Sequence, residues 1–321
     1  MTPIALAFAD LHINKWKEPP GYTGDRLLHS CRPLDVIGQR AKALGVPILF
    51  AGDLFHKPKA IDNEVIESFV DYYRTYIEDL GVRFIAISGN HDQSQKNTYK
   101  QKSPSYIKTF SKVFKTMQCI DNEVWTSNSI VVCGVPYYTH NLGINKALKH
   151  LKRQVSLEKR FKILLLHSDI PGATNSAGFE IKESHRIPKD IDRYFKAFDL
   201  VLVGHIHKPQ QLGKFTWMMG SPYQQNSGDM GTEMGYWEIY TVGPPKLIPL
   251  DLPQYKYYNP KKPLPDTYHI YIPKPKKEKG IIHGNFGVDM KKTSVAKNYL
   301  KATGVKSKRK KKALVTLLKE I

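Results

Sequence analysis

Five short apolar segments of the sequence each end in side chains that can bind a metal ion. These side chains are those of Asp10, His12, Asp53, Asn90, His167, His205 and His207. Two carboxylates, one amide and four imidazoles are too many donors for one ion and suit two, provided that one carboxylate bridges. Mixed imidazole and carboxylate ligation favours Mn, Fe or Zn over Mg alone. Two ions about 3.5–4 Å apart can activate water and hold both oxygens of a phosphoryl transfer, so the predicted chemistry is phosphoester hydrolysis.

Each of these signals is weak when taken alone. A single histidine on an apolar strand is more often a satisfied core residue than a ligand, and a Gly-Asn pair by itself favours a turn. The spacing of Asp10 and His12, or of His205 and His207, is as readily explained by a polar strand edge. Five such endings in one chain, each behind a strand-like run, indicate a shared site.

The segment FIAISGNHDQ, Phe84 to Gln93, places three polar side chains in a row behind an apolar run. Burying Asn90, His91 and Asp92 without partners would cost several kcal/mol. An exposed turn is one explanation, and a ligand-binding cleft at the end of the strand is the other. The four other segments with the same kind of ending favour the cleft.

The elements that must position these residues form an α/β pattern. Strand-length apolar runs alternate with helical periodicity, as in DNEVIESFVDYYRTYIEDLG, where Asp62 is the expected cap and Gly81 the expected stop. Open α/β sheets place ligands in a crevice beyond the carboxyl ends of their strands, where all five polar groups would meet. If the first strand continues through its polar end, Asp10 and His12 face the same side.

Composition limits the class of protein. The 321 residues include no apolar run near the ~20 residues of a membrane span, and the N-terminus lacks the basic segment of a signal peptide. Three scattered cysteines fit a reducing compartment. We therefore expect a cytoplasmic protein without a membrane partner, in the host cytosol if a phage encodes it. The net charge of +20 favours a polyanionic partner such as nucleic acid.

The charge and the periodicity divide the chain into three predicted parts. Residues 1–254 carry the α/β pattern and the metal-type residues, and residues 255–286 form a Pro/Lys-rich linker or reduced cap. Residues 287–321 form a basic pair of short helices, which are marginal alone and are expected to dock onto a partner. The run KSKRKKK in this part either contacts DNA phosphates or is simply solvated.

The motifs D-x-H, G-D-x-x-H, G-N-H-D and G-H-x-H, with a strand-ending histidine before the last, resemble those of calcineurin-like metallophosphoesterases. The resemblance covers roughly residues 1 to 240. It implies an α/β fold, a four-layer α/β/β/α sandwich with a dinuclear metal site. The segments AGDLFHKP, LVLVGHIHKPQ and MMGSPYQQNSGDMGTEMGYWEI look like the nuclease subunit of SbcCD-type DNA repair complexes, especially the short recombination endonuclease subunits of large phages.

The resemblance also implies a role for each residue. It implies that one ion binds Asp10, His12, Asp53 and His207. It implies that the second binds Asp53, Asn90, His167 and His205, with Asp53 as the bridge. The implied ions are Mn²⁺, with Mg²⁺ as the alternative.

Three further residues are implied to serve catalysis. His91 would face the scissile phosphate, where it stabilises the transition state or protonates the departing oxygen. Asp92 would orient the His91 ring. His56 matches a histidine of the family's nucleases, and a supporting hydrogen bond is the alternative reading of it.

The function implied by the resemblance is that of a metal-dependent DNA nuclease, an exonuclease with endonuclease activity in recombination and repair. Its partners would be DNA, an SMC-like coiled-coil ATPase subunit and a second copy of the chain. A phosphodiesterase or phosphatase for nucleotides or phosphoproteins is a second hypothesis, and a catalytically silent DNA-binding scaffold is a third. The basic C-terminal part argues against the phosphatase, and the complete ligand set argues against the scaffold.

Overall fold

The computed structural model describes residues 1–17, 22–94, 97–98, 103–259, 261, 264, 266 and 268–273. The basic helical pair predicted for 287–321, its KSKRKKK run and part of the predicted linker lie outside the described residues. The predicted boundaries at 254 and 286 therefore stay predictions.

Two six-stranded sheets form the centre of the described chain. The first has the order β12-β11-β1-β2-β3-β4, with β1 (Ala5–Phe8), β2 (Ile48–Phe50), β3 (Phe84–Ala86), β4 (Met117–Cys119), β11 (Gly235–Ile239) and β12 (Lys246–Pro249). The second has the order β5-β6-β7-β8-β10-β9, with β5 (Val124–Thr126), β6 (Ile130–Val135), β7 (Phe161–His167), β8 (Leu200–Gly204), β9 (Gln210–Gln211) and β10 (Thr216–Met218). Strands β1 to β4 are parallel, as are β6, β7, β8 and β10, so each set ends at one edge of its sheet.

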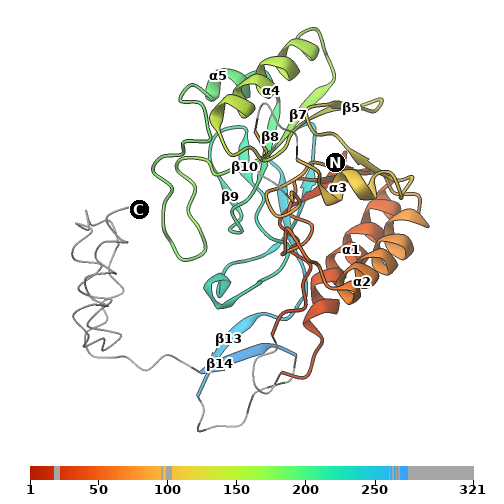
Figure 1. Cartoon of the computed structure of the whole chain (residues 1–321), viewed down its shortest axis with the longest axis vertical. Helices are drawn as coiled ribbons and strands as arrows, with labels where there is room; N and C mark the ends of the chain where they lie inside the picture. The colour runs from red at the N-terminus through yellow and green to blue at the C-terminus, as the bar shows by residue number, and fades with distance from the viewer. Residues whose placement is uncertain are drawn as a thin grey trace, which may run out of the picture. The chain divides into compact units, whose positions relative to one another are not determined.

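Helices cover the outer faces of both sheets. They are α1 (Arg26–Leu44), α2 (Asn63–Tyr73) with its π-helical continuation η1 (Arg74–Glu78), α3 (Tyr106–Phe110), α4 (Asn141–Gln154) and α5 (Asp192–Phe195). The 3-10 turn η2 (Ser227–Asp229) lies beside the later strand β13 (Tyr255–Tyr258). Helices α1 and α2 lie on one side of the strands, and α4 and α5 lie on another (Figure 1). The layers are thus helix, sheet, sheet, helix, which confirms the predicted four-layer α/β/β/α class.

Alternate residues of the central strands build separate cores. In β1, Leu6 and Phe8 pack with the α1 and α2 side chains, while Ala5 and Ala7 face the other sheet. All four are fully buried, which explains why the strands read as continuous apolar runs. Each large side chain removed from water in this way contributes about 1.5–3 kcal/mol. The short alanines let the two sheets approach each other closely.

Helix α1 was not anticipated from the sequence. Pro33 and Gly38 lie inside it and obscure its periodicity. Its buried side chains nevertheless recur at helical spacing, and they include Leu27, Cys31, Leu34, Ile37 and Ala41. Asp25 caps the start by accepting hydrogen bonds from two backbone N–H groups, and Gly45 ends the helix at φ +66°. Gly38 is required because a Cβ there would lie 2.1 Å from the Tyr76 carbonyl oxygen of η1.

The helix predicted after Asp62 is α2 with η1, and Gly81 follows it at φ +67°. Beyond the sheets, β13 (Tyr255–Tyr258) and β14 (Ile270–Pro273) pair in parallel, and β14 is the short strand expected in TYHIYIP. Every helix in the described part of the chain is too short or too polar to span a bilayer.

Candidate metal centre

The carboxyl ends of β1, β2, β3, β7 and β8 bring the ten predicted site residues into one contiguous cluster. The cluster comprises Asp10, His12, Asp53, His56, Asn90, His91, Asp92, His167, His205 and His207. Eight of them form three groups whose ligand atoms lie within 4.8 Å of one another. Hydrogen bonds attach Asn90 and Asp92 to those groups.

The first donor group consists of Asp10, His12 and His207. The Nε2 atoms of His12 and His207 are 3.2 Å apart, and His12 Nε2 is 3.9 Å from Asp10 Oδ1. Asp10 and His12 are almost completely buried. Gln225 donates to the Asp10 carbonyl at 2.7 Å, and the His205 backbone N–H donates to the Asp10 carboxylate, which fixes both ends of this residue.

The second donor group consists of Asp53, His167 and His205, with Asn90 beside them. Asn90 Oδ1 lies 3.0 Å from His167 Nε2 and 2.9 Å from His205 Nδ1. His167 Nδ1 lies 2.6 Å from the Ala51 carbonyl oxygen, to which it donates. That bond directs the Nε2 atom toward the shared site, as second partners of metal-binding histidines commonly do.

Asp53 lies between the two groups. Its Oδ2 atom is 3.5 Å from His12 Nε2 and 3.4 Å from His167 Nε2. Its Oδ1 atom accepts a hydrogen bond from the backbone N–H of His91 at 2.7 Å. One oxygen therefore faces both donor groups, which is the position that a bridging carboxylate requires.

Left-handed backbone conformations, rather than strand alternation, aim these side chains. Strand β1 ends at Phe8, and Asp10 and His12 follow at φ +54° and +46°. Asp53 and His205 also have positive φ, at +63° and +106°. The strand does not continue through Asp10 and His12, so the condition for their sharing a strand face is not met, yet both side chains reach the same donor group. Such conformations cost non-glycine residues about 1–3 kcal/mol each and persist where the surrounding structure enforces them, typically at functional sites.

Gly89 allows the turn after β3 to approach the turn after β2. A Cβ on Gly89 would lie 2.1 Å from Asp53 Oδ1 and 2.7 Å from His167 Cε1. No side chain fits in that space, so glycine is required for the G-N-H-D turn to approach Asp53 and His167 this closely.

Asp92 positions the backbone and not the His91 ring. Its carboxylate accepts hydrogen bonds from the backbone N–H groups of Asp53 at 2.8 Å, Leu54 at 2.9 Å and Gly89 at 2.8 Å. The expectation that Asp92 orients His91 was therefore wrong. Asp92 instead joins the turns after β2 and β3, and so holds Asp53 and Asn90 in register.

His91 is oriented by the main chain of His56. Its Nδ1 atom donates to the His56 carbonyl oxygen, which leaves Nε2 as the free edge of the ring. The two imidazoles stack with ring centroids 5.4 Å apart, and His12 contacts His91 edge-on at 4.6 Å. Trp16 packs on His56 with centroids 4.4 Å apart. This half-buried histidine pair thus borders the first donor group.

Electrostatics of the cluster fit a site for cations. Burial raises the pKa of Asp10 to about 8, against the opposing effect of His167. Burial lowers the pKa of His205 to about 4. Burial also disfavours charge on His167, but the Asp53 carboxylate outweighs it and raises the His167 pKa to about 9. Burial would likewise raise the pKa of Asp53, yet His167 and His12 hold it below its usual value.

The donor set passes a simple test for divalent ions. Imidazole nitrogens and carboxylate oxygens converge, with the ligand atoms of each group within 4.8 Å of one another, and the Asn90 amide oxygen lies beside the second group. The buried Nδ1 atom of His12 has no hydrogen-bond partner among the described residues. Donor crowding of this kind is costly unless positive charge joins it, and the mixture of N and O ligands suits transition metals. These groups can therefore hold metal ions.

Several residues that border the cluster escaped the sequence analysis. Gln225 holds Asp10 through its carbonyl, and Tyr137 places its ring 5.7 Å from that of His205. Asp169 and Arg186 form an ion pair of 2.9 Å, and Arg186 lies over the Tyr137 ring. Asp169 and Tyr137 each lie two residues beyond a strand, and Gln225 lies in the segment MMGSPYQQNSGDMGTEMGYWEI, so their positions carried a signal, whereas Arg186 follows no strand or motif.

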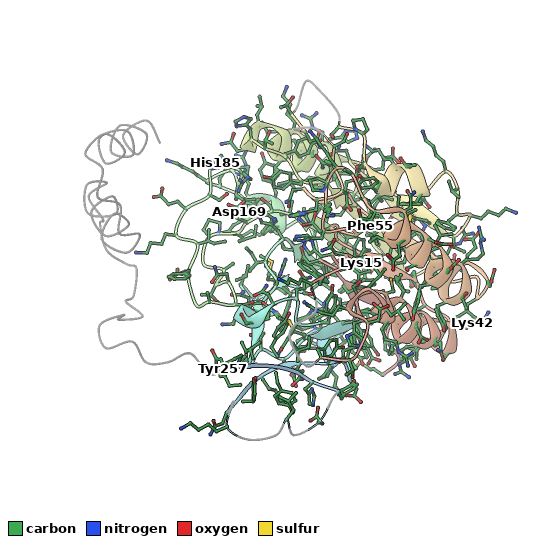
Figure 2. All side chains as sticks on the ribbon, turned by 60° about the horizontal axis from the view of Figure 1, so that its bottom comes forward. Lys15, Lys42, Phe55, Asp169, His185 and Tyr257 are labelled. Atoms are coloured by element: carbon green, nitrogen blue, oxygen red, sulfur yellow. The ribbon has the colours of Figure 1, made fainter. Side chains whose placement is uncertain are left out.

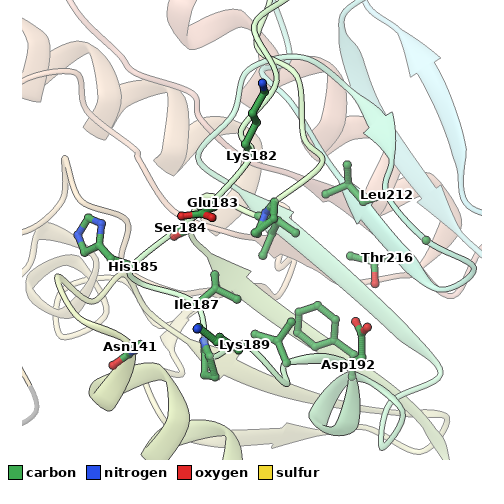
Figure 3. A pocket seen from close by; sticks show the side chains of 16 residues that line it. Asn141, Lys182, Glu183, Ser184, His185, Ile187, Lys189, Asp192, Leu212 and Thr216 are labelled. Atoms are coloured by element: carbon green, nitrogen blue, oxygen red, sulfur yellow. The ribbon is translucent and has the colours of Figure 1, made fainter. Parts of the chain in front are cut away.

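A pocket of about 910 Å³ lies outside the ligand cluster. It is bordered by α5, the start of α4 and the segment before α5, and its walls include Ile187, Asp192 and Thr216 (Figure 3). None of the predicted ligands lines it. The chemistry assigned to the cluster therefore does not involve this pocket.

Comparison with known proteins places these observations in a family. The family model for calcineurin-like phosphoesterases matches residues 6–209. The chain is 23% identical over 204 residues to an SbcCD nuclease subunit of Staphylococcus saprophyticus, a match covering 59% of this chain and 53% of that protein. The corresponding protein of Staphylococcus epidermidis is 25% identical over 205 residues, covering 59% and 54%. The match thus spans about half the length of these two relatives.

Among solved structures, a dimetal phosphatase from Danio rerio aligns with a TM-score of 0.45 at 8% identity, covering 74% of this chain and 94% of that one. The family match spans more than half of the chain and contains all ten clustered residues, since it begins before Asp10 and ends beyond His207. Members of this family are hydrolases that act on phosphoesters. The chain belongs to the calcineurin-like phosphoesterase family.

Proposed function

We propose that this protein is a DNA nuclease that depends on two divalent metal ions and hydrolyses phosphodiesters in recombination and repair. It would act as an exonuclease with endonuclease activity. The observation that carries this proposal is the position of Asp53 between two donor groups, with His91 at the border of the cluster. That arrangement suits in-line attack on a phosphate.

The choice of DNA as substrate rests on two supports. Two relatives, matched over about half their length, are named as subunits of the SbcCD nuclease. The chain also carries a net charge of +20, which favours a polyanion. Neither feature is expected of a phosphatase for small nucleotides.

The ions would be held by side chains of the two donor groups. Asp10, His12 and His207 would hold one ion, and Asn90, His167 and His205 the other, with Asp53 shared between them. Mn²⁺ suits this mixed set, with Mg²⁺ as the alternative. When bound, two such ions activate water and neutralise charge on the phosphoryl group.

The remaining residues of the cluster would act on the substrate. His91, with its Nδ1 fixed by the His56 carbonyl, would direct Nε2 at the phosphate or at the departing sugar oxygen. His56 would support His91 by stacking and through its main chain, and Asp92 would keep the two turns together. All three roles concern orientation and proton supply and are consistent with transition-state stabilisation.

The proposal extends to the partners. An SMC-like coiled-coil ATPase subunit and a second copy of this chain would assemble with it in the cytoplasm. We propose residues 1–254 as the nuclease domain, 255–286 as a linker or reduced cap, and 287–321 as the part that docks onto the ATPase. The similarity to the SbcCD nuclease subunits supports the ATPase partner.

Cleavage of labelled DNA tests the proposed activity. The full chain is incubated with Mn²⁺ and with linear duplex or single-stranded DNA, beside p-nitrophenyl phosphate as a monoester. Metal-dependent shortening of the DNA is expected, and Asp53→Asn is expected to lose it. Hydrolysis of the monoester with intact DNA would instead support the phosphatase. DNA binding without hydrolysis of either substrate would support the scaffold.

A further inference from the structure

Arg186 lies at the border of the metal centre without being one of its ligands. It belongs to the segment between β7 and α5, and its guanidinium carbon lies 5.4 Å from the centroid of the Tyr137 ring. That ring in turn contacts His205 at 5.7 Å and His167 at 6.1 Å. A cation is therefore placed next to the second donor group, at the end of the cluster away from the His56 and His91 pair.

Asp169 fixes this arginine. It lies two residues beyond His167, and its Oδ1 atom accepts from Arg186 Nη1 at 2.9 Å. Asp169 and His185, the residue before Arg186, lie on the same side of the molecule (Figure 2). The side chains of Arg186 and Asp169 are 26% and 12% exposed, so the pair is partly desolvated and holds a defined geometry.

The backbone of Tyr137 is also held in place, which limits where its ring can lie. Its backbone N–H donates to the Ser88 carbonyl at 2.9 Å, and its carbonyl accepts from Gln93 at 3.1 Å and Asn97 at 3.0 Å. These partners come from the turn region that supplies Asn90. The guanidinium over this ring is therefore kept at a fixed position relative to the metal ligands.

One hydrogen-bond donor of Arg186 has no partner in the described part of the chain. A guanidinium offers five N–H donors, and its Nε atom is buried without a hydrogen-bond partner in the described part of the chain. A purely structural ion pair would be expected to satisfy such a donor. The planar fork of a guanidinium can bind two oxygens of one phosphate group, so an arginine with an unused donor beside this centre suits a phosphate ligand.

We propose that Arg186 binds the phosphate adjacent to the scissile one in a nucleic-acid strand, on the side of His205. Tyr137 and Asp169 are positioning residues for it. The inference rests on the proposed nuclease function and deepens it, because it specifies a substrate with consecutive phosphates. A small phosphodiester without a second phosphate would not use this contact.

Arg186→Met tests the contact, with Arg193→Met as a matched control. Arg193 also pairs with an aspartate, Asp190, and also lies over a tyrosine ring, that of Tyr194, but none of its described contacts is with the metal centre. Both variants lose one positive charge. KM and kcat are measured with Mn²⁺ on a single-stranded oligonucleotide and on bis-p-nitrophenyl phosphate, over a range of salt concentrations.

For Arg186→Met we expect KM for the oligonucleotide to rise about tenfold, the effect of one charged hydrogen-bonded contact. The slope of log KM against the logarithm of salt concentration should fall by about 0.7, since one phosphate contact is lost. The catalytic efficiency, kcat/KM, on bis-p-nitrophenyl phosphate should stay within about twofold of the parent, as should all values of Arg193→Met. Arg186→Lys should raise KM for the oligonucleotide less than Arg186→Met does, because lysine keeps the positive charge but lacks the paired N–H donors of the guanidinium.

Equal losses on both substrates would overturn the proposal, since Arg186 would then act on the scissile phosphate or on folding. An unchanged KM for the oligonucleotide would also overturn it. A second readout does not depend on catalysis: fluorescence anisotropy of a labelled oligothymidylate, titrated with metal-free protein. If the parent cleaves no DNA, the nuclease proposal fails, and the contact then stands only if Arg186→Met, but not Arg193→Met, weakens this binding about tenfold.

Discussion

At the scale of single residues, two buried acids of the cluster have pKa values shifted in opposite directions. Asp10 and Asp53 are buried within a few ångströms of four histidines, yet the pKa of Asp10 is raised and that of Asp53 is lowered. The difference arises because the Asp53 oxygen faces His12 and His167 directly. The residue types could be recognised from the sequence, but this division between the two acids depends on distances that only the folded chain sets.

Replacing His91 separates catalysis from metal binding. His91→Asn keeps an N–H donor for the His56 carbonyl but removes the imidazole edge. We expect kcat for DNA cleavage to fall about 10²–10⁴-fold, the usual contribution of a general acid or base. Mn²⁺ affinity should remain that of the parent. Cleavage at the parent rate would refute the role given to His91, and loss of metal binding would make it a ligand instead.

The affinity for metal should depend on pH in a defined direction. Protons compete with the ion for Asp10, whose pKa is raised to about 8, and for His167, whose pKa is raised to about 9. Both hold a proton at neutral pH, so apparent Mn²⁺ affinity should rise from pH 6 to about 8 and binding should release protons. Calorimetric titrations in buffers of different ionisation enthalpy measure both quantities. A constant affinity over this range would contradict the assignment of these ligands.

At the scale of elements, the strands could be predicted from the sequence and the conformations of the turns could not. Apolar runs identified β1, β2, β3, β7 and β8 because a strand buried on both faces excludes polar residues. Helix α1 was missed because Pro33 and Gly38 interrupt its pattern, although packing against η1 stabilises it. The positive φ values of Asp10, His12 and Asp53 were also unreadable, since these residue types do not require them.

The turn after β3 offers a test of the close approach. In Gly89→Ala the added Cβ would lie 2.1 Å from Asp53 Oδ1, so the turn must shift away from the shared acid. We expect Mn²⁺ affinity to fall by at least about tenfold, which corresponds to 1.4 kcal/mol. Titration of the purified variant with Mn²⁺ measures the loss.

Gly81→Ala is the control for this variant. Gly81 has φ +67° but nothing within 4 Å of an added Cβ. Its replacement should cost about 1–2 kcal/mol of folding stability through backbone strain and leave Mn²⁺ affinity unchanged. If Gly89→Ala binds Mn²⁺ as the parent does, the turn is not what holds Asp53 in place.

At the scale of the whole molecule, a buried arginine joins segments that are distant in the sequence. Arg26 lies between the rings of Trp16 and Tyr255, and it donates to the carbonyl oxygens of Gln225 at 2.9 Å and Lys17 at 3.2 Å. Gln225 in turn holds the main chain of Asp10. Arg26 therefore connects β13, α1 and the N-terminal segment to the first donor group.

Arg26→Met should lower the free energy of unfolding by about 3 kcal/mol, because charged hydrogen bonds and two ring contacts are lost. Arg40→Met is the control on the same helix. Arg40 pairs with Glu238 at 2.9 Å but is 45% exposed, so its loss should cost clearly less stability than the loss of Arg26. Chemical denaturation of both variants measures the difference, and similar values for the two would contradict the connecting role.

The α/β pattern and seven ligand-type residues could be identified in advance because apolar runs and motifs report on local burial and chemistry. The four-layer arrangement and the candidacy of His56, His91 and Asp92 were implied only by the family resemblance. The residues around the cluster were not identified in advance, because Arg186, Tyr137 and Arg26 reach the site through tertiary contacts alone. Asp92 shows the same limit, since its three backbone partners come from two turns that only the folded chain brings together.

The most direct measurement is a crystal of the protein soaked with Mn²⁺, with anomalous scattering used to locate the ions. The account predicts two ions, one on each side of Asp53, with Asp10, His12 and His207 around one and Asn90, His167 and His205 around the other. Asp53→Asn should weaken both. A single ion, or ions bound away from Asp53, would contradict the central claim that one carboxylate joins two metal sites.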